Sequence, residues 1–89
     1  MTTQVHQATA TIDDLLRVLG KSALDEARAV EEHLAGARIY LLGAMPEEYA
    51  LNLELARQAT ASIPESSTRK EVETYLDRLA SYETRAPHR

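Results

Sequence analysis

Met45-Pro46-Glu47-Glu48 is the clearest boundary in the chain, and the expected fold follows from it. Proline suits the first turn of a helix, where its missing N–H costs nothing, and glutamates there are stabilised by the positive end of the helix dipole. We therefore expect a helix to begin at Pro46. The joint before it, Ala44–Met45, is so short that the preceding helix must be followed by a tight antiparallel return.

The segment before this boundary is predicted to be one long helix from Ser22 to Gly43. Ser22 and Asp25 have the spacing of a capping box, and a leucine-rich stripe follows them. Residues 38–42, which lie between Gly36 and Gly43, are also compatible with a short strand. A lone strand would leave its backbone donors unpaired, and the sequence has no second strand candidate. Helix is therefore the favoured interpretation.

Three further helices are expected along the chain. Thr11 opens a capping box with Asp14 and begins a short helix that ends at Gly20. The helix that begins at Pro46 should end near Ala61, before a proline. The last helix is expected over residues 68–83. The pattern predicts an all-α fold, a small bundle of three to four helices built on an antiparallel helical hairpin.

The domain organisation is expected to be simple. Residues 1–10 are polar and lack a strong period, so we interpret them as a flexible N-terminal segment. Residues 11–83 should form a single helical domain, because 89 residues allow one domain at most. Residues 84–89 are interpreted as a C-terminal tail.

The core has to be built from aliphatic side chains and four tyrosines, because the sequence has no Phe, Trp or Cys. Each aromatic side chain buries about 150–250 Å², so a short chain with few of them has a thin core. Neither a disulfide nor a thiolate metal site is available to reinforce that core. We therefore expect dimerisation to complete the bundle.

The widest apolar face belongs to the helix that begins at Pro46. Its apolar residues, Leu51 and Leu55 among them, span about 200° on a helical wheel, which is typical of a helix with neighbours on two sides. It is predicted to be the central helix. Asn52 falls inside this arc and should hydrogen-bond to a neighbouring helix or lie at an interface. The side chains expected to be mostly buried are Leu34, Leu41, Leu53, Leu55, Ala56, Val72, Leu76 and Leu79.

A second face of the 22–43 helix consists of small residues. Ala29, Gly36 and Gly43 recur at seven-residue spacing, and His33 and Tyr40 flank them. Glycine inside a helix costs about 0.5–1 kcal/mol relative to alanine, so such a position often has another backbone packed against it. The alternative is that Gly36 is merely tolerated and Gly43 only ends the helix. We expect a second copy of the chain at this face, in a two-fold dimer. The candidate interface is then Ala29, His33, Gly36, Tyr40, Gly43 and Asn52.

Motifs of catalytic, cofactor and metal sites are absent from the sequence. It holds no nucleophile elbow, phosphate loop, dinucleotide fingerprint, zinc helix or calcium loop. Adjacent acidic residues, such as Glu31 and Glu32 beside His33, point about 100° apart on a helix and do not share a site. We therefore predict no enzyme activity, no catalytic residues, no cofactor and no metal.

The charge and hydropathy of the chain restrict its partners. A net charge of −4 with scattered basic residues disfavours nucleic acids and anionic membranes. A short helix–turn–helix over residues 11–38 is the weaker, nucleic-acid alternative. The longest apolar stretch, Ile39–Leu42, is far shorter than the ~20 residues that span a bilayer. Without a signal-peptide pattern, the expected location is the cytoplasm.

One stretch has a likeness to a known family. His33-Leu-Ala-Gly36, then Leu42-Gly43-Ala44, then Leu53-Glu54-x-Ala56 resembles histidine phosphotransfer domains over about a third of the chain. The resemblance implies a four-helix bundle with an exposed, phosphorylatable His33. The family motif has Lys and Gly three and four residues after the histidine, where this chain has Gly36 and Ala37. The lysine that would assist the phosphoryl group is therefore missing.

The favoured function is that of a small, non-catalytic protein-binding or regulatory module. Adaptors, chaperones, immunity proteins and antitoxins are of this kind. The thin core, the acidic charge and the second helix face favour another protein as the partner, with the chain acting as a homodimer. Phosphotransfer through His33 is the alternative from a different class.

Overall fold

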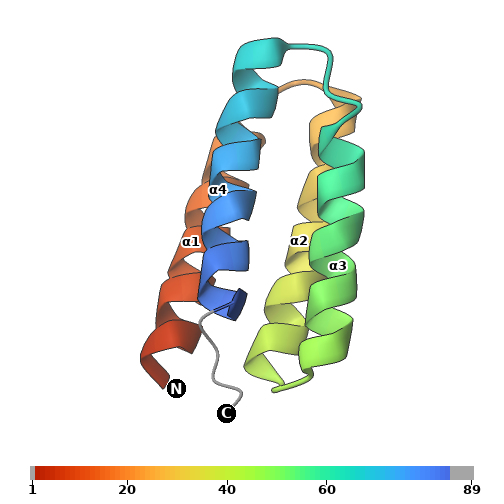
Figure 1. The fold of residues 1–89 in the computed structure, drawn as a ribbon. Coiled ribbons are helices and arrows are strands. Elements are labelled where there is room, and N and C mark those ends of the chain that lie inside the picture. The colour runs from red at the N-terminus through yellow and green to blue at the C-terminus, as the bar shows by residue number, and fades with distance from the viewer. Residues whose placement is uncertain (1, 85–89) are drawn as a thin grey trace.

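Four helices make up the fold in the computed structural model, which describes the backbone of residues 2–84 and the side chains of residues 5–82. They are α1 (Thr2–Gly20), α2 (Asp25–Leu42), α3 (Pro46–Thr60) and α4 (Ser66–Thr84). The helices stand side by side, and successive helices run in opposite directions (Figure 1). No strand occurs within residues 2–84. The all-α prediction is confirmed, and so is the helical interpretation of residues 38–42.

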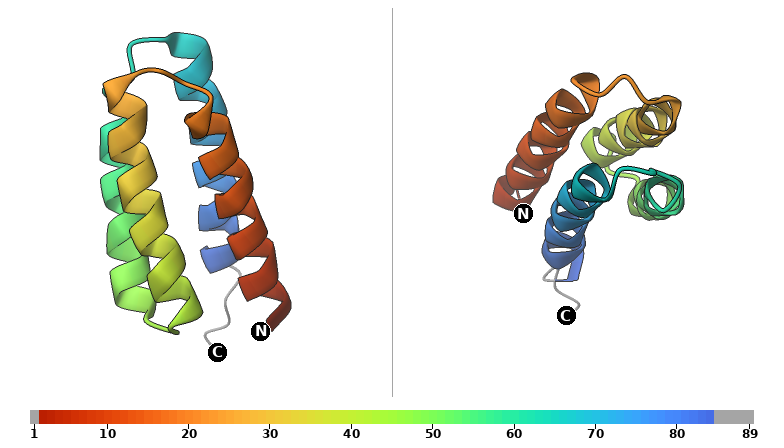
Figure 2. Two further views of the ribbon diagram at one scale, coloured as in Figure 1. Left: turned by 180° about the vertical axis from the view of Figure 1, so that it is seen from behind. Right: turned by 90° about the horizontal axis from the view of Figure 1, so that it is seen from above.

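Each helix packs against two others around a shared core. α1 and α3 each lie beside α2 and α4, whereas the backbones of the diagonal pairs lie farther apart. An end-on view shows the four helices at the corners of a quadrilateral, with α2 and α3 forming one side and α1 and α4 the opposite side (Figure 2). The bundle measures 40 × 19 × 19 Å. No helix is central in this arrangement, so the prediction of a central helix over residues 46–61 was wrong.

The core is formed by one apolar stripe from each helix. The stripes meet in the middle of the quadrilateral, and Ile63 from the α3–α4 link closes one end. The largest side chains that are fully buried there are Ile12, Leu15, Leu19, Val30, Leu34, Thr60, Ile63, Val72, Leu76 and Leu79. α1 and α4 therefore supply most of the large core residues.

Burial divides the predicted core residues into two groups. Leu34, Ala56, Val72, Leu76 and Leu79 are buried, as predicted. Leu41, Leu53 and Leu55 are only half-buried, and the prediction of near-complete burial was wrong for them. α3 contacts only α2 and α4, and these contacts cover a narrower arc than its apolar residues span. Part of the apolar face of α3 is therefore left outside the core.

α1 begins at Thr2 rather than at Thr11. Residues 2–10 therefore belong to the first helix, which corrects the predicted start at Thr11. Residue 1 lies outside the described part. Ala8 is buried in the core one turn before Ile12. Its small side chain among polar neighbours gave too weak a period to be recognised in the sequence. The Thr11 hydroxyl donates to the Gln7 carbonyl at 2.8 Å and so lies inside the helix, not at its cap.

α2 and α4 also begin without the predicted capping boxes. α2 starts after Leu24, which provides no side-chain cap, and the Ser22 hydroxyl accepts a hydrogen bond from the Leu24 N–H at 3.2 Å. α4 starts at Ser66, so Thr68 lies in its first turn and donates to the Glu65 carboxylate. The predicted tail began at residue 84, but Thr84 still belongs to α4, and residues 85–89 lie outside the described part.

The link between α2 and α3 is a Schellman motif with an alanine in the position that glycine usually takes. The Met45 N–H bonds to the Tyr40 carbonyl at 2.9 Å, and the Ala44 N–H bonds to the Leu41 carbonyl at 3.2 Å. Ala44 has a φ of 59°, in the left-handed region. Gly43, with a φ of −85°, does not need its glycine for this turn. The chain reverses within three residues and enters α3 at Pro46.

Candidate interaction surface

The predicted interface residues gather along the seam between α2 and α3. Gly36 meets Asn52 of α3 across this seam. Ala29, His33 and Tyr40 are half-buried and lie within about 60° of Gly36 on the helical wheel of α2. Gly43 is set apart from them as the C-cap of α2. A contact with α3 is therefore described at Gly36 of this stripe.

Asn52 fills the space that glycine leaves at position 36. A Cβ placed on Gly36 would lie 2.8 Å from Asn52 Oδ1, closer than side chains approach one another. Asn52 is held there because its Nδ2 donates to the Glu48 carbonyl at 2.8 Å, one turn earlier in α3. Asn52 therefore bonds within its own helix, and not to a neighbouring helix as one of our expectations had it. Its carbonyl oxygen lies against the glycine.

The neighbour at the small-residue stripe is consequently α3 of the same chain. We expected a second copy there, and that expectation is corrected at Gly36, because Asn52 already occupies the space beside it. A close neighbour was expected beside Gly36, and Asn52 is that neighbour. Glycine at position 36 has a structural reason, which is that any side chain there would displace Asn52.

His33 lies between the core stripe and this seam and is half-buried. Phosphotransfer in the family that the sequence resembles needs an exposed histidine in mid-helix. His33 is in mid-helix, since α2 runs from Asp25 to Leu42, but part of its surface is covered. Its placement gives the phosphotransfer alternative no added support.

Large apolar side chains are exposed on the α2–α3 side of the bundle. Ile39 is 68% exposed, Leu51 58%, Leu42 55% and Met45 42%. All of them belong to α2, α3 or the link between these helices. They are the exposed large hydrophobic residues among the described side chains, and we refer to these four residues as the outer apolar face.

The positions of these residues follow from the Gly36–Asn52 contact. On the wheel of α2, Ile39 lies about 60° beyond Gly36, on the side opposite to the buried Leu34. On α3, Leu51 lies about 100° beyond Asn52, again away from the core. Both therefore point away from α1 and α4, on either side of the seam. Leu55, half-buried, lies between Leu51 and the seam.

The sequence contained a signal for this surface that we interpreted differently. The apolar arc of α3 is wider than the contacts of one bundle helix require, and we assigned the surplus to a central position in the core. In the structure the surplus faces outward at Leu51. Ile39 and Leu42 belong to a short apolar run, and nothing in the sequence of that run indicates that both are exposed.

The basic side chains of α2 and α3 are directed toward the other half of the bundle. Arg38 pairs with Asp13 of α1 at 2.8 Å, and Arg57 pairs with Asp77 of α4 at 3.3 Å. Arg28 donates to the carbonyl of Leu19 in α1 and pairs with Glu31. No arginine or lysine of these two helices is left for the outer apolar face.

Acidic side chains surround the outer apolar face. Glu47 and Glu54 lie one turn before and one turn after Leu51 on the same side of α3. Glu32 precedes Ile39 by seven residues and shares its side of α2. Glu32, Glu47, Glu48 and Glu54 form no ion pair with any described residue. The surface is therefore apolar in the middle and negatively charged at its edges.

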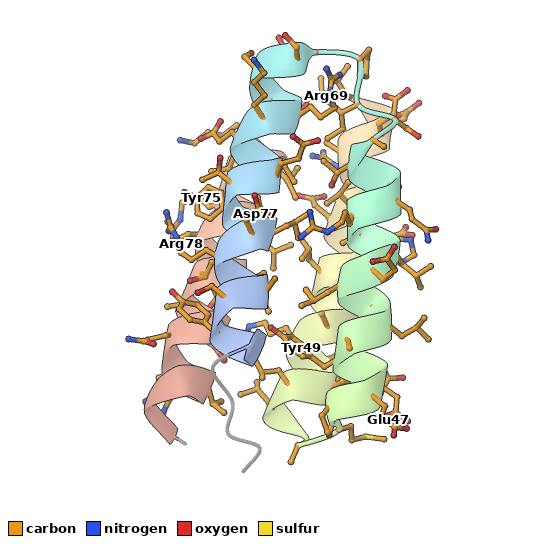
Figure 3. The ribbon with its side chains drawn as sticks, viewed as in Figure 1. Glu47, Tyr49, Arg69, Tyr75, Asp77 and Arg78 are labelled. Carbon is orange, nitrogen blue, oxygen red and sulfur yellow. The ribbon has the colours of Figure 1, made fainter. Side chains whose placement is uncertain are left out.

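The end of the bundle near the α2–α3 link is hollowed. A depression of about 360 Å³ lies there, and its lining is almost wholly apolar. Tyr49 points from α3 into the bundle beside it, whereas Glu47 points away from the bundle at the start of α3 (Figure 3). The residues that line the depression are Val5, Tyr40, Leu41, Ala44, Met45, Pro46 and Tyr49. Met45 belongs both to this depression and to the outer apolar face, so the two are continuous.

Among the described residues, no three side chains of His, Asp or Glu come together as metal ligands would. None of the helices over residues 2–84 has the length and hydropathy needed to cross a membrane. Comparison with known proteins found no matching family model, no matching curated protein and no matching solved structure.

Proposed function

We propose that this protein is a non-catalytic protein-binding module and that its outer apolar face is the binding surface. The observation that carries the proposal is the exposure of Ile39, Leu42, Met45 and Leu51 on one side of the bundle. Single exposed hydrophobic residues are ordinary, but a group of them with a polar rim is typical of a protein-interaction site. Fully burying one such side chain stabilises a complex by about 1.5–3 kcal/mol before the costs of association.

The form of the helix pair supports the same proposal. We propose that α2 and α3 act as an antiparallel hairpin that presents one face to the core and the other to the partner. The seam is closed by the Gly36–Asn52 contact, which brings the two helices near to each other. A surface built on two closely packed helices is already in its binding shape, so association loses less conformational entropy. The cytoplasm stays the predicted location.

The sequence predicts a homodimer, but the two copies would have to contact each other through a surface other than the small-residue stripe. The small-residue stripe is covered by α3 at Gly36, so a second copy has no access to it there. The outer apolar face is the surface that a second copy would have to cover. Dimerisation through it stays a prediction, and below we argue for a different occupant.

The two alternatives from other function classes gain nothing from the structure. The arginines in the predicted helix–turn–helix segment are engaged elsewhere: Arg17 with Asp14, Arg28 with Glu31 and Arg38 with Asp13. Phosphates would have to compete with these carboxylates. His33 has neither the exposure nor the neighbouring lysine that the phosphotransfer resemblance implies.

Affinity capture from the cells that make the protein tests this function. The wild-type chain is compared with the double variant Ile39→Glu/Leu51→Glu, which places charges in the outer apolar face. Thr74→Glu is the matched control, because Thr74 is exposed on α4. We expect a protein that is captured by the wild type and by Thr74→Glu but not by the double variant. Equal capture by all three chains, or no capture at all, would contradict the proposal.

A further inference from the structure

We infer that the partner of the outer apolar face is a basic, amphipathic helical segment of another protein. This inference rests on the proposed function and adds the chemistry of the partner. It is carried by the combination of an exposed apolar stripe with unpaired acidic side chains along its edges.

The apolar part of the surface has the dimensions of a helix-binding site. Met45 and Leu55 are ten residue steps apart, which corresponds to about 15 Å along a helix. Leu51 and Leu55 on α3 and Ile39 on α2 lie on either side of the seam, which makes the stripe two helices wide. A partner helix of about three turns, with apolar residues at spacings of three and four, would cover it.

The negative charge at the edges of the surface favours a partner with a positive charge. Leu51 has Glu47 and Glu54 as its neighbours one turn away on α3, and Glu32 extends the same acidic edge on α2. None of these three glutamates forms an ion pair with a described residue. A partner with lysine or arginine beside its apolar residues would complement all three, and an acidic partner would be repelled.

The same charges disfavour a second copy at this surface. A two-fold contact places the same patch of both molecules face to face. The glutamates around Leu51 would then approach those of the other copy. Arg38 and Arg57, which might offset this repulsion, are paired with carboxylates of α1 and α4. A different chain with a basic edge avoids this repulsion.

Titration with designed helical peptides tests the inference directly. Three labelled peptides of about 18 residues share one leucine face and differ only in the flanking positions, which are Lys, Gln or Glu. Binding is followed by fluorescence anisotropy at low and at high salt, and the site is located from the amide chemical shifts of the isotope-labelled protein. The folding of each variant is checked by circular dichroism.

Two pairs of variants serve as controls. Leu51→Glu is compared with Thr74→Glu, one on the outer apolar face and one on the exposed side of α4. Glu32→Lys is compared with Glu71→Lys, because both glutamates are exposed and both substitutions change the net charge by the same amount. The inference requires that the first substitution of each pair weakens binding of the Lys peptide and that the second leaves it unchanged.

We expect the Lys peptide to bind at least tenfold more tightly than the Gln peptide, and the Glu peptide not to bind. The preference should shrink at high salt, because mobile ions screen exposed charges. The shifted amides should lie around Ile39 and Leu51. Leu51→Glu should abolish binding, and Glu32→Lys should weaken it several-fold.

Three results would overturn the inference. Equal binding of the Lys and Gln peptides would show that charge has no part in recognition, although the surface would still bind helices and the proposed function would stand. Failure of all three peptides would remove the helical partner. Self-association of the free protein that Leu51→Glu abolishes would identify a second copy as the occupant.

Discussion

The two halves of the bundle differ in where their large apolar side chains point. In α1 and α4 the large aliphatic residues of the core stripe, from Ile12 to Leu19 and from Val72 to Leu79, are buried almost completely. In α2, α3 and their link, Ile39, Leu42, Met45 and Leu51 are between 42% and 68% exposed. α1 and α4 thus bury their apolar stripes inside the molecule, and α2 and α3 in addition present apolar residues to the outside.

The difference shows that hydrophobic content does not by itself identify the core. α4 has one narrow stripe, which matches the contacts that a corner helix makes, so its apolar residues are accounted for by the fold. α3 has a wider arc than its contacts with α2 and α4 require. This surplus is the reason why we propose the α2–α3 side as the binding surface.

The largest difference in stability is expected between alanine substitutions of a core leucine and of an outer leucine. Leu76 is 2% exposed and Leu51 is 58% exposed. Leu76→Ala should lower the free energy of unfolding by about 2–4 kcal/mol, since it removes buried methylenes and leaves a cavity. Leu51→Ala should change it by less than about 0.5 kcal/mol. Urea denaturation of both variants measures this, and similar losses would abolish the distinction between the two halves.

The next effect concerns the seam that joins α2 to α3. Gly36→Leu should destabilise the protein by about 1–3 kcal/mol through overpacking against Asn52, although leucine favours helix more than glycine does. In an Asn52→Ala background the cost should fall markedly, because the clashing atom is gone. A double-mutant cycle measures this coupling. If Gly36→Leu instead stabilised the fold and left Asn52 undisturbed, the described seam would be incorrect.

A gain in stability is expected at the link between the two helices. Ala44 holds a left-handed conformation with a φ of 59°, which costs an L-residue roughly 1 kcal/mol and glycine almost nothing. Ala44→Gly should therefore stabilise the fold by up to about 1 kcal/mol, offset in part by the greater entropy of glycine in the unfolded chain. Ala35→Gly in mid-α2 serves as the control, because Ala35 lies in regular helix. This substitution should destabilise the fold by about 0.5–1 kcal/mol. A loss of stability in both variants would contradict the Schellman geometry.

The smallest effect should come from the ion pair between the halves. Arg38 and Asp13 join α2 to α1 at 2.8 Å, and both side chains are partly exposed. Exposed pairs contribute about 0.2–1 kcal/mol, so the coupling between Arg38→Met and Asp13→Asn should lie in that range and decrease in high salt. A coupling that salt leaves unchanged would indicate that the pair is shielded from solvent more than its exposure suggests.

How much of this structure was predictable varied with the strength of the local signal. Pro46 and the two glutamates after it fixed the start of α3, and the clean stripe of α4 fixed the burial of Val72 and Leu76. The first half of α1 was missed because Ala8 is a weak hydrophobic signal among polar residues. The capping boxes at Thr11 and Thr68 were misassigned because the same residue types also form local bonds inside helical turns.

The candidate site was predictable only in part, because its position depends on which neighbours each helix has. The spacing of Ala29, Gly36 and Gly43 indicated a close contact, but periodicity within one helix does not identify the neighbour. Asn52 is that neighbour. The exposed apolar surface therefore lies outside the seam, around Leu51. Which residues of a helix are exposed depends on the helices that pack against it, and the sequence of one helix does not identify them.

Site-specific photo-crosslinking in the cells that make the protein tests the central claim most directly. A photoreactive amino acid is placed at position 51 on the outer apolar face or at position 74 on the exposed side of α4, and the products are separated by mass. The account predicts a discrete crosslinked product from position 51, formed with another protein, and none from position 74. Crosslinks from position 74 alone, or the same products from both positions, would contradict the claim that α2 and α3 carry the binding surface.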